Sequence, residues 1–228
     1  YAEKYFAELN FGYNGSENFA PGHRFGFFPS VGLGWVLSNE KWFEPVTKVI
    51  NFMKLRATWG KVGNSKITGR RFAYLATIQG RYNYTFGQSS EQNFNGLEIG
   101  EEAVDVSWET AYKWNAGLDL NTLDNALSLH LDFFHEFREG IFLSRGDLPW
   151  YVGMTNMPLG NLGKVKNKGF EISADYKKQF DDNWFLSVMG NVSFNRNEVV
   201  DNDVRYAYPW LDVRGQRVGQ RYGYIAEK

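Results

Sequence analysis

The most regular feature of the chain is a period-two alternation of apolar and polar residues, which predicts β-strands rather than helices. Along residues 5–13, Tyr, Ala, Leu, Phe and Tyr share one face, while Glu, Asn and Gly occupy the other. The same alternation predicts strands at 31–37, 53–59, 72–78, 112–120, 127–133, 170–176 and 186–194. Residues 82–86 would form a short partner for 72–78, and one more strand is predicted near 218–224. The chain is therefore predicted to be all-β and antiparallel, with about nine or ten strands.

Two regularities distinguish these strands from those of a soluble β-sandwich. Several hold the alternation for about ten residues, the span of a tilted membrane strand, whereas strands of globular proteins commonly stop near five or six. A cation at the bilayer midplane of a barrel costs about 2–4 kcal/mol, so a lipid-facing surface must exclude charge. Mid-strand charges all fall on one face: Glu8, Lys54, Arg56, Lys113, Asp119, Asp132, Glu171 and Asp175. The pattern predicts an antiparallel transmembrane β-barrel segment.

The connections between the predicted strands alternate in length. Residues 123–126 and 179–183 read as tight turns, whereas 139–164 and the segment from 196 onward are long and contain Gly, Pro and aromatic residues. Short turns at one rim and long loops at the other are typical of outer-membrane barrels. The connection over 38–51 is an exception, because it is longer than the other connections at its rim.

Composition narrows the possible functions. The 228 residues include 25 Lys and Arg against 26 Asp and Glu, a formal net charge of −1, which argues against a nucleic-acid-binding protein that works through bulk positive charge. Aromatic residues make up 18% of the chain, which excludes a disordered tail. The chain has no cysteine, so disulfides, thiolate metal sites and cysteine nucleophiles are excluded.

No sequence motif indicates catalysis or metal binding. The three histidines, at positions 23, 130 and 135, lack the spacing of a zinc-binding HExxH motif. Asp181-Asp182-Asn183 lacks the glycine and the further ligands of a calcium loop, and reads as a tight turn. We therefore predict that the chain is not an enzyme and that it binds no cofactor or metal.

Seven segments of the chain together carry a family resemblance. They are YFAELNFGYNGSENFAPGHRFGFFPSVGLGW (5–35), MKLRATWGKVGN (53–64), WETAYKWNAGLDL (108–120), LSLHLDFF (127–134), NLGKVKNKGFEIS (161–173), NVSFNRN (191–197) and GQRVGQRYGY (215–224). In this order they resemble the barrel of SusC/RagA-type TonB-dependent outer-membrane transporters. One such segment would be moderate support, but seven in order across nearly the whole chain make the resemblance specific.

The resemblance implies that residues 1–228 are part of one barrel domain, the central-to-late wall of a 22-stranded barrel. The plug domain of such a transporter is not among these residues, and the edge strands would pair with parts of the protein outside them. Family members import glycans or peptides beneath a SusD-like surface lipoprotein that acts as a lid, with TonB supplying the pull. The implied location is the outer membrane of a Gram-negative bacterium. The implied partners are these two proteins, outer-membrane lipid and the substrate, with no nucleic acid.

Two groups of side chains are then candidates for function. Inward-facing polar residues would line the transport pathway or hold the plug, although they could also be solvated wall residues: Lys54, Arg56, Lys113, Glu171 and Asp175. Aromatic residues of the long loops would stack on a sugar or contact the lid, although they could instead pack within their own loops: Trp150, Tyr151, Tyr206, Tyr208 and Trp210.

Two other classes of protein remain open at this point. A soluble, β-rich carbohydrate-binding module would grip a glycan with exposed aromatic residues and would stay monodisperse without detergent. A complete small barrel of about eight or ten strands, with an adhesive or structural role, would have a native polypeptide near 26.3 kDa.

Overall fold

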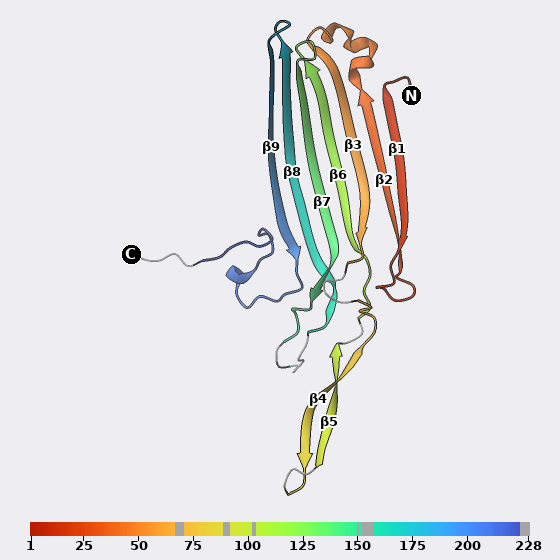
Figure 1. The fold of residues 1–228 in the computed structure, drawn as a ribbon, viewed down its shortest axis with the longest axis vertical. Helices are drawn as coiled ribbons and strands as arrows, with labels where there is room; N and C mark the ends of the chain where they lie inside the picture. The colour runs from red at the N-terminus through yellow and green to blue at the C-terminus, as the bar shows by residue number, and fades with distance from the viewer. Residues whose placement is uncertain (67–70, 89–91, 102–103, 150, 152–156, 224–228) are drawn as a thin grey trace, which may run out of the picture.

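The sheet is long, curved and open (Figure 1). The computed structural model describes residues 1–66, 71–88, 92–101, 104–149, 151 and 157–223. Seven strands within this part form one antiparallel sheet in the order β1-β2-β3-β6-β7-β8-β9, and β4 with β5 forms a separate hairpin. The strands are β1 Tyr5–Gly15, β2 Phe25–Val36, β3 Ile50–Asn64, β4 Thr77–Phe86, β5 Gln92–Glu101, β6 Glu109–Thr122, β7 Leu127–Ser144, β8 Leu159–Gln179 and β9 Phe185–Asp201. The expected antiparallel all-β architecture is confirmed.

The two ends of the sheet differ in their connections (Figure 1). At one end, residues 123–126 and 180–184 form tight turns closed by backbone hydrogen bonds, the second one residue later than the predicted 179–183. Leu123, Asp124 and Asn125 have positive φ angles, a conformation that Asp and Asn tolerate better than most residues. At the other end lie the long connections, and the β4–β5 hairpin projects beyond the sheet there.

Cross-strand register separates the sheet into an apolar face and a polar face. One row across the sheet consists of Tyr5, Trp35, Leu55, Leu118, Leu131, Ile172 and Val192. The adjacent row, on the opposite face, consists of Phe6, Gly34, Arg56, Gly117, Asp132, Glu171 and Ser193. Leu9 and Phe11 on the apolar face are 80% and 77% exposed. Because soluble monomers rarely expose so continuous an apolar surface, hydrocarbon is the environment that suits this face.

The apolar band crosses the sheet obliquely. Leu9, at the middle of the band on β1, aligns through successive cross-strand pairs with Arg196 on β9. The apolar stretch of β9, residues 186–194, is instead centred on Gly190, six residues away (196 − 190). Across six strand-to-strand steps, the band therefore slips by about one residue per strand. With a rise of about 3.3 Å per residue and about 4.7 Å between strands, this slip corresponds to a strand tilt of about 35°, as barrel closure requires.

The sequence pattern was wrong over residues 72–86. It predicted that 72–78 pairs with 82–86, whereas 77–86 form one strand, β4, which pairs with the unpredicted strand β5. A β-bulge between Gly80 and Asn83 disrupts the alternation that would have revealed the hairpin. Ala73 lies outside any strand, fully buried beside Phe19 and Val106 in a small core at the loop end of the sheet. The strand predicted near 218–224 is not formed over the described residues 218–223.

The turn end of the sheet carries an aromatic cluster. The ring of Trp35 lies 6.3 Å from that of Tyr5 and 6.5 Å from that of Trp42. Glu40, between the short helices η1 (Leu37–Asn39) and η2 (Lys41–Val46), accepts hydrogen bonds from Tyr5 Oη at 2.7 Å, Lys4 Nζ at 3.0 Å and Trp35 Nε1 at 3.2 Å. These donors hold the pKa of Glu40 below its ordinary value, with the Tyr5 hydroxyl contributing most. Tyr and Trp with polar partners are typical of a membrane–water interface. None of the helices described is long and apolar enough to cross a membrane.

Candidate functional site

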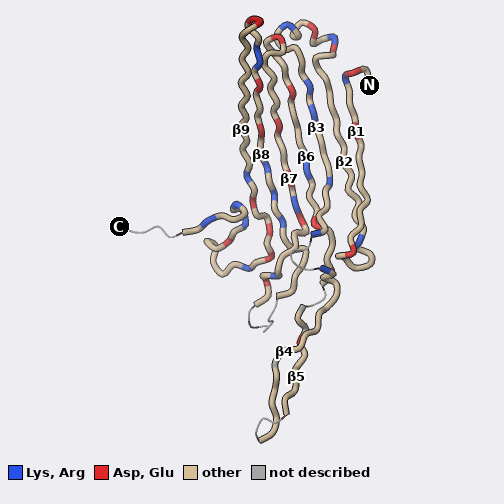
Figure 2. The backbone as a smooth tube through the Cα atoms, viewed as in Figure 1, with Lys and Arg blue, Asp and Glu red and all other residues tan. Residues whose placement is uncertain are grey.

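The polar face of the sheet carries most of the ionisable side chains of the strands. Charged residues lie along β3, β6, β7 and β8, whereas β2 has none (Figure 2). All five polar residues predicted to face a lumen are on this face: Lys54, Arg56, Lys113, Glu171 and Asp175. The polar face is therefore the first candidate for a functional surface.

Arg56 joins three strands through one guanidinium group. It donates from Nε to Asp119 Oδ2 at 2.8 Å, and from Nη2 to Asp119 Oδ1 at 3.0 Å and Asp132 Oδ2 at 3.1 Å. His130 Nδ1 lies 2.9 Å from Asp119 Oδ1 and extends the group. Gly117 makes this geometry possible, because a Cβ there would lie 2.7 Å from the guanidinium carbon of Arg56. Arg56 therefore crosses β6 over a glycine to reach β7.

A second charged group lies nearer the loop end of the same face. Glu136 on β7 binds Lys113 Nζ at 3.2 Å and Arg138 Nη2 at 2.7 Å. Arg138 also lies 3.2 Å from Glu109 on β6. Each cation in this group has a carboxylate partner, so the group contributes lateral cohesion between β6 and β7 and is largely neutralised internally.

The other three predicted residues do not join either group. Lys54 Nζ lies 5.0 Å from the centre of the Phe6 ring. Asp175 pairs with Lys177 on its own strand at 2.7 Å. Glu171 is exposed and lies directly opposite Asp132 in the cross-strand register. Of the predicted set, Glu171 is thus the carboxylate best placed to meet a group outside the sheet.

A shallow hollow of about 450 Å³ opens beside the second charged group. It is lined by small residues, including Gly32, Thr58 and Gly60, and by charged residues, including Glu8 and Lys113. Glu8 accepts a hydrogen bond from Asn10 at 2.8 Å, which orients the carboxylate. The hollow therefore gives an approaching chain access to the sheet through small residues flanked by charges.

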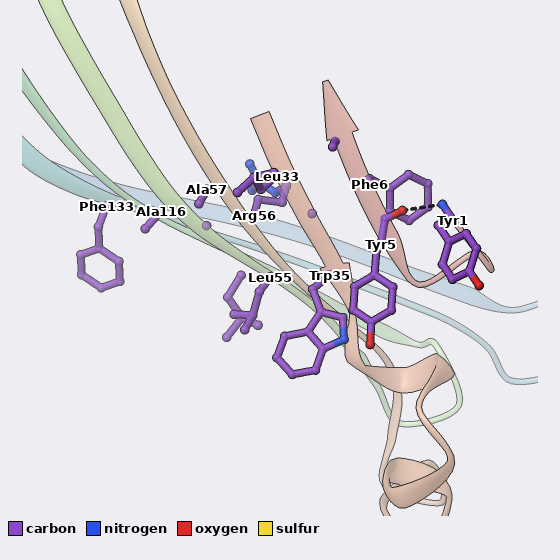
Figure 3. A pocket seen from close by; sticks show the side chains of 14 residues that line it. Tyr1, Tyr5, Phe6, Leu33, Trp35, Leu55, Arg56, Ala57, Ala116 and Phe133 are labelled. Atoms are coloured by element: carbon purple, nitrogen blue, oxygen red, sulfur yellow. Dashed lines mark hydrogen bonds between the residues drawn. The ribbon is translucent and has the colours of Figure 1, made fainter. Parts of the chain in front are cut away.

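A larger hollow of about 880 Å³ has mostly apolar walls. Figure 3 shows Tyr5, Trp35, Leu55 and Phe133 extending from one side of the sheet, whereas Arg56 lies on the other. Small side chains at Ala57 and Ala116 leave the space between these large ones. Since its walls belong chiefly to the apolar face, this hollow suits an acyl chain and is unsuited to a polar substrate.

The aromatic residues predicted for substrate contact have different surroundings. Trp150 lies outside the described residues, and its neighbour Tyr151 is exposed. Tyr206 accepts a hydrogen bond from Asn202 at 2.5 Å and lies beneath the Arg214 guanidinium, so it stabilises its own loop. Tyr208 and Trp210 stack on each other at 4.6 Å with an interplanar angle of 8°, and both remain exposed. Among the predicted loop residues that the structure describes, Tyr208 and Trp210 therefore form the flat aromatic surface that remains open to a substrate.

The β4–β5 hairpin adds a surface that sequence reasoning missed. Leu97 and Ile78 are 78% and 71% exposed, and Tyr84, Phe86 and Phe94 are also exposed. The centre of the Phe86 ring lies 4.8 Å from that of Tyr84 and 5.5 Å from that of Phe94, so these aromatic side chains form a cluster on the hairpin. An isolated two-stranded hairpin is marginally stable in water, so a partner surface would stabilise this one.

Sequence reasoning also missed the carboxylates that pair with the predicted cations. Asp119 and Asp132 were predicted to be polar-face residues, whereas Glu136 lies beyond the predicted strand 127–133. The partners of all three depend on strand register. The two charged groups on this face consist of paired acids and bases, and His130 is paired with Asp119. Such an arrangement binds and orients polar groups.

Comparison with known proteins places the chain beside a set of β-barrel receptors. Residues 4–227 match the family described as TonB dependent receptor-like, beta-barrel. TonB-dependent receptor P3 of Formosa agariphila is 29% identical over 201 residues, covering 88% of this chain and 19% of that protein. TonB-dependent receptor SusC of Bacteroides thetaiotaomicron is 28% identical over 199 residues, covering 86% of this chain and 19% of that protein. The chain therefore spans about a fifth of the length of these curated relatives.

Solved structures show the same fold. The RagAB peptide importer in its 'closed-closed' state superposes with a TM-score of 0.74 at 21% identity, over 94% of this chain and 23% of that one. The structure of the RagAB peptide transporter gives a TM-score of 0.71 at 22% identity, over 88% of this chain and 21% of that one.

Proposed function

Because the chain belongs to the family of TonB-dependent receptor-like β-barrels, we propose that it forms part of the wall of an outer-membrane barrel that imports nutrients. The observation that carries the proposal is the one-sided sheet: seven paired strands with an apolar face and a polar face bearing linked ion pairs. A dry protein core would disfavour this density of charge, whereas a water-filled lumen accommodates it.

We propose that residues 1–228 belong to a single barrel domain of about 22 strands, with the plug domain supplied by other parts of the same protein. Support comes from the two edges of the sheet, since β1 and β9 are not paired with each other among the described residues. In hydrocarbon every backbone donor and acceptor needs a partner, so further strands must pair with both edges. A barrel of that width has a lumen that side chains do not fill, and a plug is needed to gate it.

The substrate class that we propose is a glycan or a peptide. The Tyr208–Trp210 pair offers a flat apolar surface on which a sugar ring or a peptide side chain can stack. The polar face, with Glu171 exposed upon it, would contact the plug or the passing substrate. TonB would act on the plug, and none of the groups described here is assigned a catalytic role.

A SusD-like lipoprotein lid would rest on the loop end of the barrel, where the β4–β5 hairpin projects. The exposed apolar residues of the hairpin suit such a contact, since apolar anchors dominate protein interfaces. Replacing Leu97 by aspartate is expected to weaken lid binding at least about tenfold, because it places a charge in a desolvated contact. The measurement is the affinity of the purified lipoprotein for the full-length barrel protein in detergent.

Asn95→Asp is the matched control for the hairpin, because it adds the same charge to the same face of β5, next to Leu97 on that face, without removing an apolar side chain. The control should bind the lid as the unmodified protein does. Equal binding by Leu97→Asp and the unmodified protein would remove the hairpin from the lid interface, while leaving import itself untouched.

The import proposal is tested with the full-length protein in its native membrane. We expect it to require detergent for extraction, to co-purify with a surface lipoprotein, and to retain a glycan or peptide identifiable by mass spectrometry. A strain lacking the protein should lose growth on that compound as sole nutrient. A full-length protein that is monodisperse in plain buffer would instead support the soluble carbohydrate-binding alternative.

A further inference from the structure

Two cations occupy the apolar face where the band ends toward the loops. On that face Lys168 precedes Phe170 along β8, and Arg196 follows Phe194 along the antiparallel strand β9, so both cations lie on the loop side of these rings. Lys168 and Arg196 are direct cross-strand partners, and both side chains are exposed. The neighbour of Lys168 on β7 is His135, whose ring stacks on Trp114 at 5.7 Å. Three nitrogen-bearing side chains thus lie in one row across β7, β8 and β9.

These two cations have no carboxylate partner among the described residues. Glu198, two residues beyond Arg196 on β9, forms its ion pair with Lys166 at 2.7 Å. Like charges placed directly opposite on neighbouring strands repel. The row therefore holds excess positive charge that an external anion would neutralise.

The depth of this row matches that of lipid headgroups. On the same face of β8, Lys168 and Lys178 enclose Phe170, Ile172, Ala174 and Tyr176. Ten residues separate the two lysines (178 − 168), which at about 3.3 Å per residue and a tilt of about 35° is a height of about 27 Å. The apolar band of outer-membrane barrels is about 25 Å tall, so Lys168 lies at the hydrocarbon boundary on the loop side.

We propose that Lys168 and Arg196 bind the phosphate of an anionic lipid headgroup in the leaflet on the loop side. The Arg196 guanidinium matches a phosphate with two parallel donors, and the Lys168 ammonium adds a point charge beside it. Below them, the rings of Phe170 and Phe194 stack at 5.8 Å, and Phe133 lies 6.4 Å from Phe170. These rings provide a floor for acyl chains, which a free phosphate ion would not use. The site depends on the membrane orientation proposed above.

Native mass spectrometry of the full-length protein in detergent tests the site. The probes are dioleoyl phosphatidic acid and dioleoyl phosphatidylcholine, which differ only in the headgroup. We expect the unmodified protein to prefer phosphatidic acid, and the double variant Lys168→Gln/Arg196→Gln to bind it about 25-fold more weakly, about five-fold for each cation removed. The charge-conserving double variant Lys168→Arg/Arg196→Lys should retain most of the affinity, which separates lost binding from misfolding.

The double variant Lys54→Gln/Lys113→Gln is the matched control, because it removes two cations from the polar face of the same sheet. It should bind phosphatidic acid as the unmodified protein does. Three results would overturn the proposal. They are an equal loss of phosphatidic acid binding in this control, equal affinity of the unmodified protein for the two lipids, and complete displacement of phosphatidic acid by inorganic phosphate at the same concentration as the lipid. None of these outcomes bears on lid binding or on growth with the imported nutrient, so a failure of the lipid site is distinguishable from a failure of the proposed function.

Discussion

Replacing Ile172 by lysine is expected to destabilise the inserted protein by about 2–4 kcal/mol. Ile172 lies on the apolar face of β8, in the row that joins Leu131 to Val192. A charged side chain there must remain in hydrocarbon or pull the strand out of place, because its cross-strand neighbours, Leu131 and Val192, are apolar. The free energy is measured by urea unfolding of the full-length protein in lipid vesicles, together with its level in the outer membrane.

Ser173→Lys is the matched control, since the next residue of the same strand points to the opposite face. Ser173 lies between His130 and Asn191 in the cross-strand register, among polar neighbours. Its lysine variant should unfold at nearly the same urea concentration as the unmodified protein. A larger loss at Ser173 than at Ile172 would mean that the apolar face does not meet the lipid, and the barrel assignment of the two faces would be reversed.

The second large effect is expected from replacing Arg56 by glutamine, which should lower the free energy of unfolding by about 1–3 kcal/mol. The change leaves the carboxylates of Asp119 and Asp132 beside each other without the cation that joins them. Their side chains are only 17% and 23% exposed, so water replaces the lost hydrogen bonds incompletely. The expected value lies below that of a fully buried pair, because lumen water reaches part of the group. Urea unfolding in the same vesicles measures it.

Lys54→Gln removes a charge from the same face of the same strand, two residues away. Lys54 contacts the Phe6 ring and no carboxylate within ion-pair distance among the described residues, so its loss should cost less than that of Arg56. Adding Asp132→Asn to the Arg56 variant should recover part of the stability, because one repelling charge is then removed. If the Arg56 and Lys54 variants were equally stable, the three-strand ion-pair group would have no structural role.

Most of the strands could be read from the sequence because alternation is a local property. Residues 5–13, 112–120 and 127–133 lie within the strands β1, β6 and β7, each with the predicted face apolar. The β4–β5 hairpin could not be read in this way. Its bulge interrupts the alternation, and its apolar residues lie on a projection outside the main sheet.

The candidate site, too, could be predicted from the sequence only in part. Arg56 and Lys113 were identified as polar-face residues from their position in the alternation, but their partners were not. Asp132 is 76 residues from Arg56 along the chain, and only the order β3-β6-β7 brings the two together. Gly117 gains its role from that order too, since a side chain there would block the guanidinium.

The sequence by itself determined which side of each main strand is apolar and which side is polar, because a period of two needs no knowledge of neighbours. The tertiary structure alone decided which charges pair, where the β4–β5 hairpin stands, and that Lys168 faces Arg196 at the edge of the apolar band. These features depend on strand register, which is set by hydrogen bonding between segments distant in the chain.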